Sequence, residues 1–230
     1  GESIVTAPSQ TLSDNDYQKL RNASFDIVEA LNIQGGCNVQ FALNQKTGEY
    51  FVIEVNPRLS RSSALASKAT GYPIARVATK IALSKSLPEI INPITGKTAF
   101  FEPALDYVVI KIPKWPDNKF FDMNKIIGIT MKSTGEVMAI GRSFEEAMYK
   151  AIQSLDLKEN VFDKFSDLPK KELHELLKNP NTQRLSAIFA AFYQKLTNEE
   201  ISDITNINPW FISKLKSLFE QKEDISSKIN

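Results

Sequence analysis

Cysteine and histidine are nearly absent, since the 230 residues contain one of each, Cys37 and His174. A single cysteine excludes an internal disulfide, and the alternation around Cys37 predicts a strand position on an apolar face rather than a nucleophile. A single histidine excludes a metal site built on several histidines. We expect His174 to be a solvated helix residue and no part of a catalytic triad.

The chain also lacks an excess of charge and long apolar runs. Its 28 basic residues balance 27 acidic ones, giving a net charge of +1. We therefore expect neither a nucleic-acid partner nor a membrane surface. No run approaches the roughly 18 apolar residues of a membrane span, and no signal segment is recognised. A hydrophobic share of 42% and a charged share of 24% are typical of one or two globular domains.

Residues 50–56 alternate in polarity and predict a β-strand with two unlike faces. The apolar face comprises Phe51, Ile53 and Val55, and the other face comprises Val52, Glu54 and Asn56. A carboxylate and a carboxamide therefore point the same way. Pro57 ends the strand because it cannot donate a backbone hydrogen bond. Arg58 and Arg61 follow, and a guanidinium fork suits phosphate or carboxylate oxygens.

A second strand is predicted over residues 37–43, joined to the first by a polar loop over residues 45–49 that contains a glycine. This loop predicts three facing pairs: Gln40 with Glu54, Phe41 with Ile53, and Leu43 with Phe51. Facing residues have Cβ atoms about 4.5–5.5 Å apart. One divalent cation could therefore take an oxygen from both Gln40 and Glu54.

Two interpretations of this hairpin stay open from the residues alone. In the first, a divalent metal carries nucleotide phosphates on the polar face, because the polar groups are oxygen ligands and two arginines flank them. In the second, the hairpin is half-buried and its outer face is merely polar.

The rest of the chain divides into a mixed part and a helical part. Helices are predicted over residues 13–31, 62–70, 73–84, 143–152, 170–178, 183–196, 198–205 and 209–222, and further strands over residues 3–6, 106–112, 126–132 and 136–140, the last two as a hairpin. The absence of a regular βαβ rhythm favours an α+β fold with a mainly antiparallel sheet over residues 1–157. Residues 158–230 are predicted as a small all-α domain.

Residues 197–215 have the length and apolar spacing of a DNA-binding helix-turn-helix, within the helical segment 183–222. Charge argues against this alternative. Residues 197–222 contain three lysines and four acidic residues, a net charge of −1, whereas DNA affinity depends largely on cationic contacts.

Several motifs, taken in order, resemble the large subunit of carbamoyl phosphate synthetase. They are the signature from Ile53 to Gly71, the opening Ala7 to Leu12, and the segments Asn38–Phe41, Phe101–Pro103, Asp106–Val109, Lys111–Pro113 and Met131–Met138. The resemblance extends from Gly1 to about Ser154 and continues more faintly, with Pro209, Trp210 and Phe211 resembling a recurrent helix of the family's oligomerisation domain.

The resemblance implies the later, C-terminal part of an ATP-grasp domain that forms carboxyphosphate from bicarbonate and ATP. By position, Gln40 and Glu54 would bind Mg²⁺ or Mn²⁺ and ATP phosphates, and Asn56 would be a further metal ligand. Arg58 and Arg61 would bind the transferred phosphoryl group and the bicarbonate or carboxyphosphate.

The resemblance further implies that the chain is a fragment, with the phosphate lid, the adenine and ribose contacts and a second ATP site outside it. We therefore expect the isolated chain to be inactive. The whole enzyme would be oligomeric and would take ammonia directly or from a glutaminase subunit or domain. It would serve arginine, pyrimidine or urea production. Its location would be cytoplasmic, or mitochondrial with a targeting segment. Another ATP-grasp carboxylase, such as a biotin carboxylase, is the alternative enzyme.

Overall fold

The computed structural model describes residues 2–116, 125–128, 130–157 and 159–229. Backbone contacts divide the chain into two compact units. One unit comprises residues 9–106, and the other comprises residues 1–8 together with 107–230. None of the helices in the described ranges is long and apolar enough to cross a membrane.

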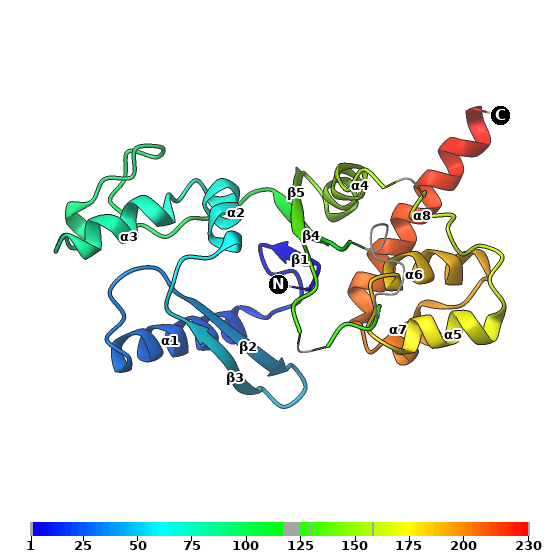
Figure 1. Cartoon of the computed structure of the whole chain (residues 1–230), viewed down its shortest axis with the longest axis horizontal. Coiled ribbons are helices and arrows are strands. Elements are labelled where there is room, and N and C mark those ends of the chain that lie inside the picture. Colours follow the sequence, from blue (N-terminus) through cyan, green and yellow to red (C-terminus); the bar gives the residue numbers. More distant parts are fainter. Residues whose placement is uncertain (1, 117–124, 129, 158, 230) are drawn as a thin grey trace. The chain divides into compact units, whose positions relative to one another are not determined.

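The unit of residues 9–106 is a β-hairpin accompanied by helices (Figure 1). Its elements are α1 (Asp14–Ala30), β2 (Asn38–Asn44), β3 (Glu49–Asn56), α2 (Arg61–Thr70), α3 (Ile74–Ala82) and the short 3-10 helix η1 (Leu87–Glu89). The predicted ranges of α1, β2, β3, α2 and α3 are confirmed to within about two residues, whereas η1 was not predicted. Ser13 caps α1, because its hydroxyl accepts a hydrogen bond from the backbone N–H of Asp16 at 3.1 Å.

The β2–β3 hairpin contains a β-bulge that the alternation pattern did not reveal. Gln40 pairs with Glu54 as predicted, but the register then shifts, so that Phe41 pairs with Val52 and Leu43 with Tyr50. The predicted pairs Phe41–Ile53 and Leu43–Phe51 are therefore wrong. Ile53 is the extra residue that one strand inserts at a bulge.

The bulge also corrects the predicted faces of β3. Phe51 and Ile53 do not form a covered apolar face, because 68% of Phe51 and 56% of Ile53 are exposed. Instead, the partly buried face carries Phe41 and Tyr50, whose rings meet edge-on with centroids 5.7 Å apart. An inserted residue reverses the inward and outward alternation of the strand before it, which explains the error.

The second unit joins a three-stranded antiparallel sheet to a helical region (Figure 1). Its elements are β1 (Val5–Ala7), β4 (Val108–Lys114), β5 (Gly135–Gly141), α4 (Phe144–Ser154), α5 (Lys170–Lys178), α6 (Arg184–Tyr193), α7 (Asn198–Thr205) and α8 (Pro209–Ile229). The strand order is β1-β4-β5. The α+β class with antiparallel pairing and a following helical region is confirmed.

One predicted hairpin, residues 126–132 with 136–140, is wrong. In the described residues β5 pairs with β4, and Ile126 forms an isolated bridge with Asn181. The physical reason is burial. Ile110 and Ile112 of β4 are 0% and 1% exposed, whereas Met131 is 68% exposed, so pairing β5 with β4 completes a core that residues 126–132 could not form.

A single hydrophobic core runs through the second unit. It includes Ile110 and Ile112 of the sheet, Met148 of α4, and buried residues of every helix from α5 to α8. Leu155 and Phe162, on either side of the predicted domain boundary at residues 157 and 158, belong to the same core. The domain boundary stays a prediction. Separating the chain into two domains at this point would divide one hydrophobic core.

The Glu2 side chain forms hydrogen bonds with residues that follow β4 and precede β5. Its carboxylate accepts hydrogen bonds from the indole N–H of Trp115 at 2.7 Å and from the backbone N–H groups of Lys132 and Ser133 at 3.1 and 3.0 Å. Desolvation alone would raise the pKa of Glu2, but these hydrogen bonds stabilise the carboxylate more strongly and lower its pKa from 4.5 to about 2.

We expect acid to remove the stabilisation that Glu2 provides. Because the folded-state pKa is depressed, the contribution is complete above pH 4.5 and is lost as the pH falls toward 2. The free energy of unfolding of the wild type should exceed that of Glu2→Gln by about 1 kcal/mol at neutral pH, allowing for solvent screening, and the difference should vanish in acid.

Urea denaturation of both proteins at a series of pH values measures this difference. Glu199→Gln, at an exposed position of α7, is the matched control and should follow the wild type throughout. A pH-independent difference between Glu2→Gln and the wild type would contradict the proposed role of the Glu2 carboxylate.

Candidate functional site

The candidate site is the face of the β2–β3 hairpin that carries oxygen-bearing side chains. Gln40 lies opposite Glu54, and Asn38 lies opposite Asn56. Both pairs share one face because residues two apart on a strand point the same way. Asn38, Gln40 and Glu54 are exposed and Asn56 is partly buried, so the end of this face near Pro57 presents three carboxamides and one carboxylate.

The bulge adds an aromatic residue to this face. Ala42 is two residues from Gln40 on β2 and pairs with Phe51. Phe51 therefore shares the polar face, although the alternation of β3 alone assigned Val52 to it. The alternation of β2 shows which of its own residues share this face, but the bulge decides which residues of β3 lie opposite them.

A tight turn follows the polar strand and directs the chain into α2. The backbone N–H of Arg58 donates to the carbonyl of Asn56 at 2.8 Å across Pro57. Ser60 precedes α2, and its N–H donates to the hydroxyl of Ser63 at 3.0 Å. Arg58 thus lies in the turn, and Arg61 is the first residue of α2. Both arginine side chains are exposed at the strand's exit, where the sequence placed them.

The N-terminal turn of α2 adds to the positive character of this exit. The helix dipole favours an anion there, in addition to the charge of Arg61. A phosphate or carboxylate group reaching the end of β3 would meet two guanidinium groups and a helix N-terminus.

A hollow of about 530 Å³ borders Arg58 within the same unit. It is lined by residues 31–36, 57–59 and Ala78. Gly36, which lines this hollow, lies close to Leu59, the residue after Arg58. A Cβ atom added to Gly36 would lie 2.6 Å from the Cδ2 atom of Leu59. The sequence alone does not reveal this contact, because residues 36 and 59 meet only in the folded chain.

The donor set fits a metal that is shared with a ligand. The described residues contain no group of three or more histidine, cysteine, aspartate or glutamate side chains able to hold a metal ion. The end of the face near Pro57 instead offers one carboxylate, Glu54, beside carboxamide oxygens. Mg²⁺ is commonly bound by one or two carboxylates together with substrate phosphates rather than by a cage of protein ligands. Gln40, Glu54 and Asn56 suit that arrangement.

Family models match both parts of the chain. Residues 1–90 match the carbamoyl-phosphate synthase L chain ATP-binding domain, and residues 136–230 match the carbamoyl-phosphate synthetase large chain oligomerisation domain. The chain is therefore, as a class, part of an ATP-binding enzyme of the ATP-grasp type joined to a helical oligomerisation region.

Curated relatives agree along nearly the whole chain. The carbamoyl phosphate synthase large chain, N-terminal section, of Methanopyrus kandleri is 54% identical over 98% of this chain, which covers 41% of that protein. The large chain of Caldanaerobacter subterraneus is 54% identical over 98% of this chain, which covers 21% of it. This chain belongs to the carbamoyl phosphate synthase large-chain family, and it spans less than half of these relatives.

Solved structures are more distant. Pyruvate carboxylase from Rhizobium etli aligns with a TM-score of 0.49 and 20% identity, covering 65% of this chain and 18% of that chain. The biotin carboxylase domain of a single-chain bacterial carboxylase aligns with a TM-score of 0.46 and 14% identity, covering 96% of this chain and 50% of that chain. These values support no argument about function.

We expect Gly36→Ala to disturb the turn that carries Arg58. The added methyl group would meet Leu59, whose side chain is 42% exposed and able to move, so the loss in free energy of unfolding should be modest, about 1 kcal/mol. A double-mutant cycle with Leu59→Ala, measured by urea denaturation, tests this contact.

In the Leu59→Ala background, Gly36→Ala should leave the free energy of unfolding almost unchanged. Gly128→Ala is the control, because an added Cβ there meets nothing within 4 Å. Equal costs of Gly36→Ala in the presence and absence of the Leu59 side chain would show that the two residues do not determine each other's position.

Proposed function

We propose that this chain supplies the metal- and phosphate-binding face of an ATP site that phosphorylates bicarbonate to carboxyphosphate. The observation that carries the proposal is the pairing of Gln40 with Glu54, beside Asn38 and Asn56, on one exposed face that ends at two arginines. The match of residues 1–90 to the ATP-binding domain of the large chain supports it.

Gln40, Glu54 and Asn56 would hold Mg²⁺ or Mn²⁺ together with phosphate oxygens of ATP. A bound divalent cation would neutralise charge on the phosphates and fix their orientation. Glu54 contributes the negative charge, while the carboxamide oxygens add ligands without adding charge. The hairpin itself is the rigid element that keeps these groups in register.

Arg58 and Arg61 would bind the transferred phosphoryl group and the bicarbonate or carboxyphosphate. The phosphoryl group carries its charge on several oxygens during transfer, and guanidinium groups in fixed positions stabilise that charge. The turn at Pro57 fixes the backbone of Arg58, and the start of α2 fixes that of Arg61. The two arginines therefore act from separate, locally ordered segments.

In the whole enzyme, ammonia would attack carboxyphosphate to give carbamate, and a second ATP would convert carbamate to carbamoyl phosphate. Bicarbonate, ammonia, a glutaminase subunit or domain, and other copies in an oligomer are thus the proposed substrates and partners. The helical region of residues 136–230, which matches an oligomerisation domain, supports the oligomer.

The two alternatives are less well supported. A biotin carboxylase shares the first chemical step, but the family models and the 54% identical relatives are carbamoyl phosphate synthases. A DNA-binding role for residues 183–222 is not supported by charge, because residues 197–222 have a net charge of −1. In addition, Ile201 of α7 and Ile212 of α8 are fully buried. Both helices therefore pack their apolar side chains into the hydrophobic core.

Glu54→Gln should lower bicarbonate-dependent ATP hydrolysis by at least about 10²-fold, the scale expected for loss of one electrostatic contributor. We suggest measuring it in a chimera in which this chain replaces the matching segment of the Caldanaerobacter subterraneus large chain. Glutamine keeps the shape of the side chain and removes the charge that attracts the cation.

Glu49→Gln is the matched control, because Glu49 is an exposed acid on the same strand next to the hairpin loop. It should leave hydrolysis nearly unchanged. Near-normal hydrolysis by a folded Glu54→Gln chimera, or no bicarbonate dependence in the unmodified chimera, would overturn the proposal.

The isolated 230-residue chain is expected to catalyse no ATP hydrolysis. One metal-binding face without an opposing nucleotide-binding part cannot exclude water or align bicarbonate. Calorimetric titration should give at most millimolar affinity for Mg·ATP, near −4 kcal/mol. Micromolar binding, or phosphate release stimulated by bicarbonate, would show that the site is complete within these residues.

A further inference from the structure

The β2–β3 hairpin forms a sheet of only two strands within the described residues. Such a hairpin is marginally stable by itself in water, and packing against a helix is one way to stabilise it. At its exit end, the turn at Pro57 and the start of α2 fix the chain. The loop end, residues 45–48, lies on the other side of the bulge and requires a separate support.

Lys19 of α1 provides that support through two contacts. Its ammonium group donates a hydrogen bond to the backbone carbonyl of Gly48 at 2.6 Å. The same group lies 5.3 Å from the centroid of the Tyr50 ring, whose electron-rich face attracts a cation. The Tyr50 ring in turn meets Phe41 on the partly buried face of the hairpin. One charged side chain therefore holds both the loop and the beginning of β3.

A second contact joins the loop to the chain before α1. The side-chain amide of Gln45 donates a hydrogen bond to the backbone carbonyl of Thr11 at 2.6 Å. Thr11 precedes α1, whereas Lys19 lies in its second turn. The loop is therefore held at two separate points, which restricts its rotation about either one.

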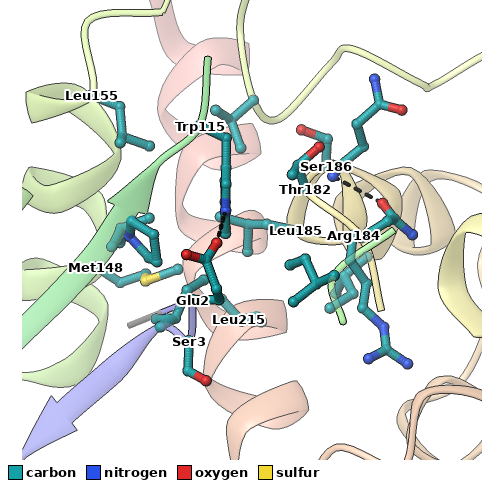
Figure 2. A pocket seen from close by; sticks show the side chains of 18 of the residues that line it. Glu2, Ser3, Trp115, Met148, Leu155, Thr182, Arg184, Leu185, Ser186 and Leu215 are labelled. Carbon is teal, nitrogen blue, oxygen red and sulfur yellow. Dashed lines mark hydrogen bonds between the residues drawn. The ribbon is translucent and has the colours of Figure 1, made fainter. Parts of the chain in front are cut away.

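Glu2 shows elsewhere in this chain how one charged side chain can join distant segments. In Figure 2 its carboxylate points toward the indole of Trp115, which donates a hydrogen bond to it at 2.7 Å although the two residues are 113 positions apart. Lys19 and Gly48 are 29 positions apart. Hydrogen bonds to ionised groups are roughly twice as strong as those between neutral groups, so a single charged side chain is an effective link.

We propose that Lys19 is a positioning residue for the metal-binding face and keeps Gln40 and Glu54 in the orientation that binds Mg·ATP. The inference rests on the proposed function. Lys19 acts through Gly48 and Tyr50, which lie on the loop side of the bulge, whereas the Gln40–Glu54 pair lies on the other side. A bulge interrupts the ladder and bends its strand, so the two ends of the hairpin change direction relative to each other unless both are held.

Release of the loop end would lower the share of molecules whose metal-binding face has the binding orientation. The apparent affinity for Mg·ATP falls in proportion to that share, because binding must first select the competent orientation. Once the nucleotide is bound, the competent orientation is the populated one, so the rate of the chemical step is retained. The expected signature is a change in KM without a matching change in kcat.

Steady-state ATP hydrolysis by the chimera measures this signature. Lys19→Met removes the ammonium group and keeps an unbranched side chain, and it should raise KM for Mg·ATP at least about fivefold while kcat changes less than about twofold. Lys19→Arg should restore KM, because a guanidinium can donate to the same carbonyl and lie over the same ring. Lys46→Met, at an exposed lysine of the same loop, is the matched control and should change neither constant.

Hydrogen–deuterium exchange of the isolated chain tests the support of the hairpin without nucleotide or activity. Peptides covering residues 41–52 should exchange about tenfold faster in Lys19→Met than in the wild type, because the loop end opens more often. Peptides covering residues 109–112 of β4 should exchange equally in both proteins. Equal exchange of residues 41–52 would overturn the proposal.

The kinetic outcomes separate this proposal from the proposed function. Loss of hydrolysis in Glu54→Gln together with an unchanged KM in Lys19→Met would refute the positioning role alone, even if exchange became faster. A lower kcat with an unchanged KM would show that Lys19 only stabilises the fold, which also refutes the role. Near-normal hydrolysis by Glu54→Gln would refute the proposed function and, with it, any role of Lys19 at a metal site.

Discussion

The pairing of Gln40 with Glu54 across the β2–β3 hairpin is the constraint on which the candidate site depends. It places Asn38 opposite Asn56 on the same face, and the strand then ends at Pro57 with Arg58 held by the carbonyl of Asn56. A slip of one residue would turn these side chains to the other face. The bulge confines its register shift to the loop side of this pair and leaves the polar pairs intact.

The composition of this face agrees with the proposal that it forms one part of a catalytic site. Glu54 is the one carboxylate among the four oxygen-bearing side chains at the end near Pro57, which is too little charge to hold a cation without further ligands. In the proposed site, phosphate oxygens of the nucleotide would supply those ligands. The residues therefore favour a metal that arrives with its nucleotide, in agreement with the match to a synthase ATP-binding domain.

The second unit connects a sheet to the oligomerisation helices through continuous packing. Phe144 of α4 contacts the rings of Trp210 and Phe211 at centroid distances of 5.4 and 5.9 Å, and Glu145 accepts a hydrogen bond from Lys214 of α8 at 3.1 Å. The sheet and the helices of this unit therefore share one hydrophobic core.

The sequence by itself determined the helices, their caps, the antiparallel α+β class and the pairing of Gln40 with Glu54. The helices follow from local periodicity and from capping side chains such as Ser13 and Ser143. The register nearest the loop differs from the predicted one, and the extra residue Ile53 restores the predicted register at the Gln40–Glu54 pair. Tertiary structure decided the bulge at Ile53, the partner of β5 and the contact of Gly36 with Leu59. Each of these depends on which distant surfaces become buried together, and a pattern of neighbours along the chain does not contain that information.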